Sequence, residues 1–148
     1  MSLTMTKEER EAFLADVHVA VISIAENGHG PLVVPIWYSC QPGGEVRIIT
    51  GRASRKGKLL ERAGRYSLCV QTETLPYKYA SVEGPIVAVE TADLERDRRP
   101  LARRFSAPKW ATRTSKARGT WSGTCLFVCD QNDGSPSTTQ SNTRHAES

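Results

Sequence analysis

The strongest chemical signal in this chain is a cluster of cations and one hydroxyl in the stretch Thr50-Gly-Arg-Ala-Ser-Arg-Lys-Gly-Lys58. Ser54 stands where a helix is expected to begin, and the cations around it are Arg52, Arg55, Lys56 and Lys58. A helix N-terminus presents unpaired N–H groups and the positive end of the helix dipole, so these side chains complete an anion site. A phosphate would be held there by charge-assisted hydrogen bonds. The same composition is also typical of a solvated basic helix that binds nothing.

The remaining residues with chemical potential do not form a recognisable centre. The chain has four cysteines, Cys40, Cys69, Cys125 and Cys129, and the spacing of the last two matches no zinc or thioredoxin pattern. The three histidines are far apart in the sequence, at His18, His29 and His145. We therefore expect no metal site and interpret the cysteines as buried thiols. No Ser-His-Asp, Cys-His or paired-carboxylate arrangement can be assembled, so no catalytic residue is assigned.

Length and composition are those of a single soluble domain. The chain has 148 residues, 24% charged and 39% hydrophobic, which is enough for one hydrophobic core. A net charge of +4 and a pI of about 9.0 favour anionic ligands without requiring nucleic acid. No apolar run is long enough to span a bilayer, and the N-terminus lacks the features of a signal peptide. We expect a cytoplasmic protein that does not contact a membrane.

The first half of the chain is predicted to form one short helix and three strands around the basic cluster. A capping box at Thr6 and Glu9 opens a helix that ends near Leu14. Strands are expected over residues 17–25, 32–40 and 45–50, and Pro35 implies an edge position or a bulge in the second. The basic helix then runs over residues 54–63 and stops at Gly64.

The second half begins with two more strands and a helix. Strands are predicted over residues 66–72 and 79–91, and the Gly84-Pro85 break in the second is typical of a bulge or a barrel corner. A charged helix follows over residues 94–105, with a start complicated by Pro100. This order predicts a mainly β protein with peripheral helices (α+β), built as a small antiparallel barrel.

The composition changes after Phe105. Residues 106–148 are rich in Ser and Thr and keep one short apolar run, Cys125 to Cys129. Segments of this composition rarely bury enough surface to offset the entropy of ordering them. We therefore expect a folded domain over residues 1–105 and a disordered or otherwise atypical tail over residues 106–148.

Four segments resemble the pyridoxamine 5′-phosphate oxidase-like split barrels, a family of flavin- and deazaflavin-binding proteins. The sequence Leu32-Val-Val-Pro-Ile-Trp-Tyr38 is similar to the second strand of the family, and Ile48-Ile-Thr-Gly-Arg-Ala-Ser-Arg-Lys56 to its third strand and phosphate-binding turn. Residues 59–70 and the sequence Ser81-Val-Glu-Gly-Pro-Ile-Val87 resemble the helix end and the strands that follow. The resemblance implies an antiparallel split β-barrel of the FMN-binding type, and homodimers with cofactor sites between subunits.

The resemblance also implies which residues hold the cofactor. Arg52, Ser54 and Lys56 would grip its phosphate, and Arg55 lies beside them. Its ring and ribityl chain would be lined by Pro35, Ile36, Trp37, Ile49 and Thr50. A flat ring system needs apolar walls, and a phosphate needs cations, so the residue types agree with this assignment. Trp37 has a plainer interpretation as a core residue, and Arg55 as a solvated one.

The C-terminal tail departs from the family, whose final strand commonly carries a stretch like Pro-Glu-Arg-Trp-Leu-Thr-Val-Asp-Tyr. A one-base shift in plausible GC-rich codons lets Ser106-Ala-Pro-Lys-Trp110 read as Leu-Gly-Pro-Glu-Met. The same shift lets residues 125–141 read as Val-Phe-Val-Arg-Met-Arg-Pro-Glu-Arg-Trp-Leu-Thr-Val-Asp-Tyr-Ser-Lys. We hypothesise a frameshifted tail, caused by a sequencing error or a mutation, with the closing strand of the barrel missing or altered.

Three functions are compatible with these observations. The first is an oxidoreductase that uses FMN or a deazaflavin coenzyme and transfers hydride to or from a small molecule. The second is a non-catalytic cofactor or haem-binding module on the same barrel. The third is a nucleic-acid-binding barrel, which ranks last because the basic region has only Tyr66 beside it as a stacking aromatic.

Overall fold

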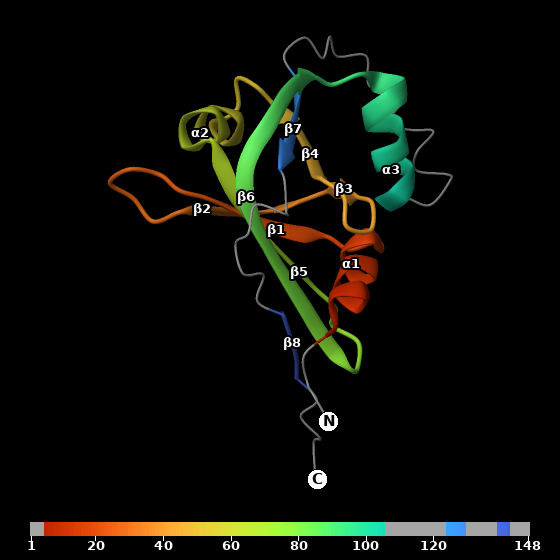
Figure 1. The fold of residues 1–148 in the computed structure, drawn as a ribbon. Coiled ribbons are helices and arrows are strands. Elements are labelled where there is room, and N and C mark those ends of the chain that lie inside the picture. Colours follow the sequence, from red (N-terminus) through yellow and green to blue (C-terminus); the bar gives the residue numbers. More distant parts are fainter. Residues whose placement is uncertain (1–4, 106–123, 130–138, 143–148) are drawn as a thin grey trace.

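A computed structural model of the chain describes residues 5–105, 124–129 and 139–142. The protein is a curled antiparallel sheet with helices at its periphery, as the sequence predicts (Figure 1). The hydrogen-bonded order of the strands is β2-β1-β5-β6-β7-β4-β3, and β8 pairs with β6 beside this path. All strand pairs are antiparallel. None of the helices in these described ranges is long and apolar enough to cross a membrane.

The N-terminal helix α1 (Lys7–Ala15) begins at the predicted capping box. The Glu9 main-chain N–H donates to Thr6 Oγ1 at 3.2 Å, and the Thr6 N–H donates to a carboxylate oxygen of Glu9 at 2.8 Å. These two bonds satisfy donors that a helix start otherwise leaves unpaired. Leu14 is the buried residue of this helix and attaches it to the barrel core.

The predicted strand over residues 32–40 forms as two strands. β2 (Leu32–Ile36) pairs with β1 (Ala20–Ile24), whereas β3 (Tyr38–Cys40) pairs with β4 (Val46–Gly51). Trp37 is the single residue between them and lets the chain pass from one end of the sheet order to the other. Pro35 lies in β2, which is an edge strand of the path, as the missing N–H of proline requires.

The basic helix is α2 (Arg55–Ala63), with Ser54 as its N-cap and Gly64 as its C-cap. Gly64 has a φ of 66°, the left-handed conformation that glycine adopts most readily, so the predicted end of the helix is confirmed. The strand after it, β5 (Arg65–Gln71), pairs with β1 on one side and β6 on the other.

The longest strand, β6 (Tyr77–Thr91), turns the corner of the barrel. It pairs with β5 as far as Pro85, and with β7 from Ile86 onwards, with a register shift between Ile86 and Ala88. The break at Gly84-Pro85 thus marks the change of partner strand, as a barrel corner predicts. A π-helical turn, η1 (Leu94–Arg98), leads into α3 (Arg99–Phe105), and Pro100 lies in the first turn of α3, where no N–H donor is needed.

The sheet continues beyond residue 105, where the sequence predicts that the folded domain ends. Residues 124–129 form β7 (Thr124–Cys129), which pairs with β4 and with β6, and residues 139–142 form β8 (Thr139–Asn142) on β6. The short apolar run Cys125 to Cys129 supplies a strand for the place between β4 and β6 (Figure 1). The rest of the predicted tail lies outside the described residues.

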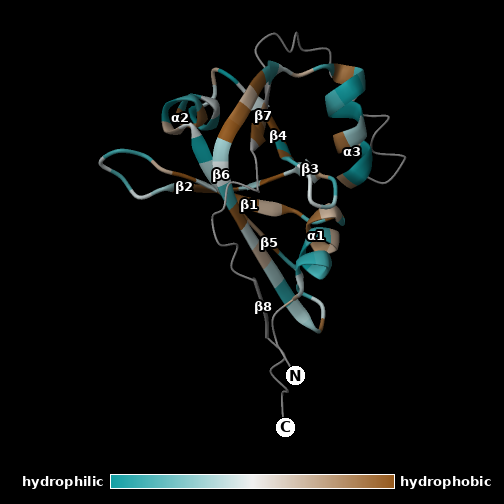
Figure 2. Cartoon of the chain, in the orientation of Figure 1, coloured by the Kyte–Doolittle hydropathy of each residue, from teal (hydrophilic) through white to brown (hydrophobic). Residues whose placement is uncertain are grey.

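One hydrophobic core fills the curled sheet. Its largest fully buried side chains come from β1, β3, β4, β5, β7 and two helices: Tyr38, Phe127, Leu14, Ile22, Ile24, Ile48, Leu60, Leu68, Val46 and Val70. The hydroxyl of Tyr38 donates to the main-chain oxygen of Leu14 at 2.7 Å, and burial raises the pKa of Tyr38 to about 12. Figure 2 shows mainly hydrophilic residues along α2, in contrast to hydrophobic stretches on strands such as β6.

Candidate functional site

The candidate site is the turn between β4 and α2, and Ser54 organises it. Its side-chain oxygen accepts from the Gly57 N–H at 3.1 Å and donates to the main-chain oxygen of Gly51 at 2.6 Å. The first intrahelical bond runs from the Lys58 N–H to the main-chain oxygen of Ser54 at 3.0 Å, and of the three helical positions before Lys58 only Gly57 donates to the Ser54 side chain. The N–H groups of Arg55 and Lys56 at those positions precede this bond and are therefore available to an anion.

The turn is packed closely against the start of α2, and Gly57 makes this possible. A Cβ atom at position 57 would lie 2.3 Å from the main-chain oxygen of Gly51 and 2.7 Å from that of Arg52. Both contacts are with backbone, which cannot rotate away. Gly57 was not predicted to matter from the sequence. The one local indication is that a glycine stands three residues after the N-cap serine. The close approach fixes the backbone around the anion site.

Two of the predicted phosphate ligands form ion pairs. Arg52 Nε lies 2.8 Å from a carboxylate oxygen of Glu61, which belongs to α2. Arg55 Nη2 lies 2.6 Å from a carboxylate oxygen of Glu26. The side chains of both arginines are about two-thirds exposed, at 64% and 66%. An exposed pair such as Arg52–Glu61 contributes little to stability, roughly 0–1 kcal/mol, so Arg52 can exchange its carboxylate for a phosphate at small cost. The Glu26 side chain is only 20% exposed, so Arg55 is held more firmly in its pair.

Lys56 is placed differently from the other cations. It is half-buried at the start of α2 and makes no ion pair with any residue in the described ranges. Burial lowers the pKa of Lys56 from its usual 10.5, since the ammonium loses hydration without gaining a counter-ion. A bound anion would supply that counter-ion. Of the predicted phosphate ligands, Lys56 is therefore the one that most clearly lacks a counter-ion.

The residues expected to line the cofactor ring do not all lie in one place. Ile49 and Thr50 lie half-buried on β4, next to the turn, and Thr50 Oγ1 lies 3.5 Å from Ser54 Oγ. Ile36 is 7% exposed and belongs to the hydrophobic core, while Pro35 is exposed on β2. Trp37 is 36% exposed and stacks on Phe105. The structure thus brings Ile49 and Thr50 together with the turn, and places Ile36 in the core.

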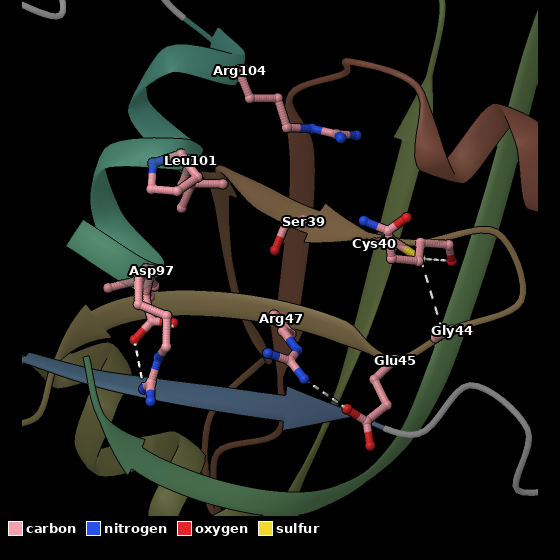
Figure 3. A pocket seen from close by; sticks show the side chains of 12 residues that line it. Ser39, Cys40, Gly44, Glu45, Arg47, Asp97, Leu101 and Arg104 are labelled. Atoms are coloured by element: carbon pink, nitrogen blue, oxygen red, sulfur yellow. Dashed lines mark hydrogen bonds and ion pairs between the residues drawn. The ribbon is translucent and has the colours of Figure 1, made fainter. Parts of the chain in front are cut away.

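A cavity of about 570 Å³ opens farther along β4, between β3–β4 and the segment η1–α3. Ile49 lines it together with Arg47, and the opposite wall comes from η1 and α3 (Figure 3). Arg47, Arg96 and Arg104 were not predicted from the sequence, because Arg47 is far from the other two in the chain and none of them belongs to a local motif. Three or more His, Cys, Asp or Glu residues in metal-binding proximity do not occur in the described part of the chain.

The curled antiparallel sheet, with a capped basic helix directly after β4, defines a split-barrel protein with a candidate anion-binding turn. The model of the pyridoxamine 5′-phosphate oxidase family matches residues 6–124. The chain belongs to this family. A comparison with curated proteins finds no match.

Solved structures with the same fold carry different descriptions. An F420 reductase has a TM-score of 0.70 and 16% identity, over 82% of this chain and 92% of that chain. An FAD-binding protein from Mesorhizobium loti has a TM-score of 0.63 and 17% identity, over 95% and 97%. A heme-binding protein from Mycobacterium smegmatis has a TM-score of 0.57 and 14% identity, over 91% of this chain and 57% of that chain. At such identities the likeness is one of fold, so the ligand of this chain must be argued from its own residues.

Proposed function

We propose that this chain is an oxidoreductase that binds FMN or a deazaflavin coenzyme and transfers hydride to or from a small molecule. The observation that carries the proposal is the start of α2, where a helix N-terminus capped by the Ser54 hydroxyl is followed two residues later by the half-buried Lys56. Both cofactors carry a phosphate, and a capped helix start with adjacent cations is a suitable binding site for one.

The residues of the turn fit this phosphate in three respects. The N–H groups of Arg55 and Lys56 precede the first intrahelical bond, the Lys56 ammonium lacks a counter-ion among the described residues, and Arg52 holds an exchangeable carboxylate. Gly57 keeps the turn and the helix too close for a side chain between them, which preserves the shape of the site. We assign phosphate binding to Ser54, Lys56 and Arg52, with Arg55 at the rim; to donate to the phosphate, the Ser54 hydroxyl turns its proton away from the Gly51 oxygen.

The rest of the cofactor can extend from the turn along the face of β4 that carries Ile49. From the turn, the strand leads back past Ile49 to Arg47, and residues two apart on a strand share a face about 6.6 Å apart. A ring system extending from the phosphate would therefore lie over Ile49 and reach the cavity shown in Figure 3. The bound cofactor supplies the hydride chemistry, and this face supplies an apolar support that orients it.

We also propose that the protein is a homodimer, formed through the outer face of β1 and β2. On this face Val19, Val21 and Val33 are 53%, 38% and 58% exposed, and Pro35 lies opposite Val21 across the strand pair. A group of neighbouring apolar side chains of this kind is costly to leave in water and is typical of an interface. Sedimentation should give twice the chain mass, and Val33→Glu should shift it toward the monomer.

Titration of the purified protein with FMN and with a deazaflavin coenzyme tests the proposed function. We expect binding of one of them, and Lys56→Ala should weaken it by about tenfold or more, since a charge-assisted contact to the phosphate is lost. Lys58→Ala is the matched control, because Lys58 is an exposed cation on the same helix. If neither cofactor binds, or if both variants behave alike, the assignment of the turn is wrong.

The second candidate function is a cofactor or haem carrier without turnover, and it is favoured by the fold shared with a heme-binding protein. Oxidation of the reduced cofactor in the presence of candidate substrates separates an enzyme from a carrier, and haem titration tests the haem alternative directly. The nucleic-acid alternative predicts salt-sensitive binding of an oligonucleotide without binding of either cofactor.

A further inference from the structure

The walls of the cavity beside β4 carry charged groups that the proposed phosphate site does not use. Its guanidinium groups come from three separate elements: Arg47 from β4, Arg96 from η1 and Arg104 from α3. Figure 3 shows Arg104 and Leu101 on one side of the cavity, with Arg47 and Glu45 on the other. The fold therefore brings Arg47 together with two cations that lie far from it in the sequence, Arg96 and Arg104.

Two carboxylates lie in the same walls, and they leave one positive charge in excess. Arg47 lies 3.3 Å from Glu45, and Arg96 lies 2.9 Å from Asp97. The three guanidinium groups and the two carboxylates of the cavity wall itself sum to a charge of +1, and Arg96 also lies 3.7 Å from Glu90, which does not line the cavity. A monoanion balances this charge, whereas a dianion would overcompensate it and would be repelled by Glu45 and Asp97.

Arg104 is the cation whose hydrogen bonding is incomplete. Its Nη2 donates to the main-chain oxygens of Ala15, at 2.6 Å, and Asp16, so that end of the guanidinium closes the last turn of α1. Its Nε is buried and has no hydrogen-bond partner within the described residues. A buried donor without a partner is destabilising, and a ligand oxygen that reached it from the cavity would satisfy it.

The apolar part of the cavity adjoins this charge. Ile49 on β4 and Leu101 and Pro100 on α3 complete the wall, and Leu101 is among the buried residues of the chain. An apolar surface next to converging arginines fits a compact molecule with an apolar body and one oxyanion. Because Arg47 shares its strand face with Ile49, such a molecule would lie beside the ring of a cofactor anchored at Ser54.

We propose that this cavity is the substrate site and that it selects small organic monocarboxylates. This inference rests on the proposed function, since it places the substrate next to the cofactor ring. Arg47 releases the exposed Glu45 and binds the substrate carboxylate in its place. The buried Nε of Arg104 favours an oxygen atom of the ligand at the opposite wall. The carboxylates of a deazaflavin coenzyme lie beyond its phosphate, away from the ring, so they do not compete for this place.

Benzoate, benzamide and phenyl phosphate are suitable probes, because they share a ring and differ in charge. Ligand-observed NMR titrations on the cofactor-loaded protein should show benzoate binding at least about tenfold more tightly than benzamide, and more tightly than phenyl phosphate. Arg47→Gln should lower benzoate affinity by about tenfold and leave benzamide unchanged. The matched control is Arg103→Gln, since Arg103 is exposed on α3 and does not line the cavity.

Equal binding of benzoate and benzamide, preference for phenyl phosphate, or equal effects of the two arginine variants would each overturn the proposal. Far-ultraviolet circular dichroism checks that both variants fold. Repeating the titration without cofactor separates this inference from the proposed function. Carboxylate preference in a protein that binds neither FMN nor a deazaflavin would overturn the redox function, whereas cofactor binding without carboxylate preference would overturn the substrate class alone.

Discussion

The indole ring of Trp37 lies parallel to the phenyl ring of Phe105, with 1° between the ring planes and 5.3 Å between the centroids. Trp37 is the residue between β2 and β3, and Phe105 is the last residue of α3. The adjacent Arg104 donates to the carbonyl oxygens that end α1. The end of α3 is therefore anchored at two points, and this holds the helix over the cavity that Arg96, Leu101 and Arg104 line.

Removing the stack should loosen α3. Phe105→Ala deletes a half-buried ring and its stacking contact, so we expect the free energy of unfolding to fall by about 1–3 kcal/mol. Urea denaturation measures the change. Arg103→Ala, at an exposed position of the same helix, should change stability by less than about 0.5 kcal/mol. Equal stability of both variants would show that the stack does not hold the helix.

Substitutions of Ser54 should separate the capping role from phosphate binding. Ser54→Ala removes the acceptor of the Gly57 N–H, and we expect a loss of about 0.5–2 kcal/mol. Ser54→Asp keeps an N-cap acceptor and suits the helix dipole, so stability should be retained. Its carboxylate occupies the place of an anion, however, and cofactor affinity should fall by at least about tenfold.

Thermal unfolding and cofactor titration of the two variants provide the measurements for Ser54. If Ser54→Asp binds the cofactor as tightly as the unchanged protein, the phosphate does not lie at this helix start. If both variants lose only stability, Ser54 is a cap without a role in binding.

Gly57 should tolerate no side chain. The added Cβ of Gly57→Ala would meet the Gly51 oxygen at 2.3 Å, so either the turn or the helix must move, at a cost of about 1–3 kcal/mol. We expect lower stability and weaker cofactor binding together, measured by urea denaturation and titration. Gly30→Ala is the matched control, since a Cβ there meets nothing within 4 Å. A fully stable Gly57→Ala would contradict the packing of this turn.

Local signals predicted the site's framework well. The N-cap at Ser54 and the left-handed stop at Gly64 follow from residue type, because few residues suit those backbone positions. The Gly84-Pro85 break likewise predicted a corner near the place where β6 changes partner. Each of these features is decided by a few neighbouring residues, and this is why one sequence is enough to find them.

Tertiary features were not predictable in the same way. The division of residues 32–40 at Trp37 depends on two different partner strands, β1 and β4, that no local pattern names. The pairing of Arg52 with Glu61 and Arg55 with Glu26 required the positions of whole elements. The strand at residues 124–129 came from a short apolar run that gains its stability from neighbours on both sides. The family match to residue 124 also extends past the domain end predicted near residue 105.

Cofactor binding should weaken at alkaline pH through Lys56. Burial lowers the pKa of Lys56 from 10.5, so in the free protein the ammonium loses its proton at a lower pH than an ordinary lysine does. Affinity is full below the lowered pKa and falls as the pH rises through it, because the phosphate loses its cation. For the stability of the free protein the sign is opposite. Folding disfavours the charged form of Lys56, and this lowers the free energy of unfolding at neutral pH. The loss disappears as the pH rises from the lowered pKa of Lys56 toward 10.5.

Titration of the cofactor over an alkaline pH series checks this dependence. Lys56→Arg keeps its charge over the whole range and should remove the alkaline loss of affinity. Lys58→Arg is the control and should retain it. An identical pH profile for all three proteins would exclude Lys56 as the titrating group.

Resequencing of the coding DNA should reveal a single-base shift after the codon for Phe105. In plausible GC-rich codons, a shifted frame reads as family-like sequence in two separate places, over residues 106–110 and 125–141. A chain with the restored frame should supply a more suitable strand for the place between β4 and β6, where residues 124–129 now pair. We expect a higher Tm and tighter cofactor binding than in the present chain, since β4, one of the two neighbours of that strand, borders the site. An intact reading frame, with the same tail in close relatives, would show that the tail is natural.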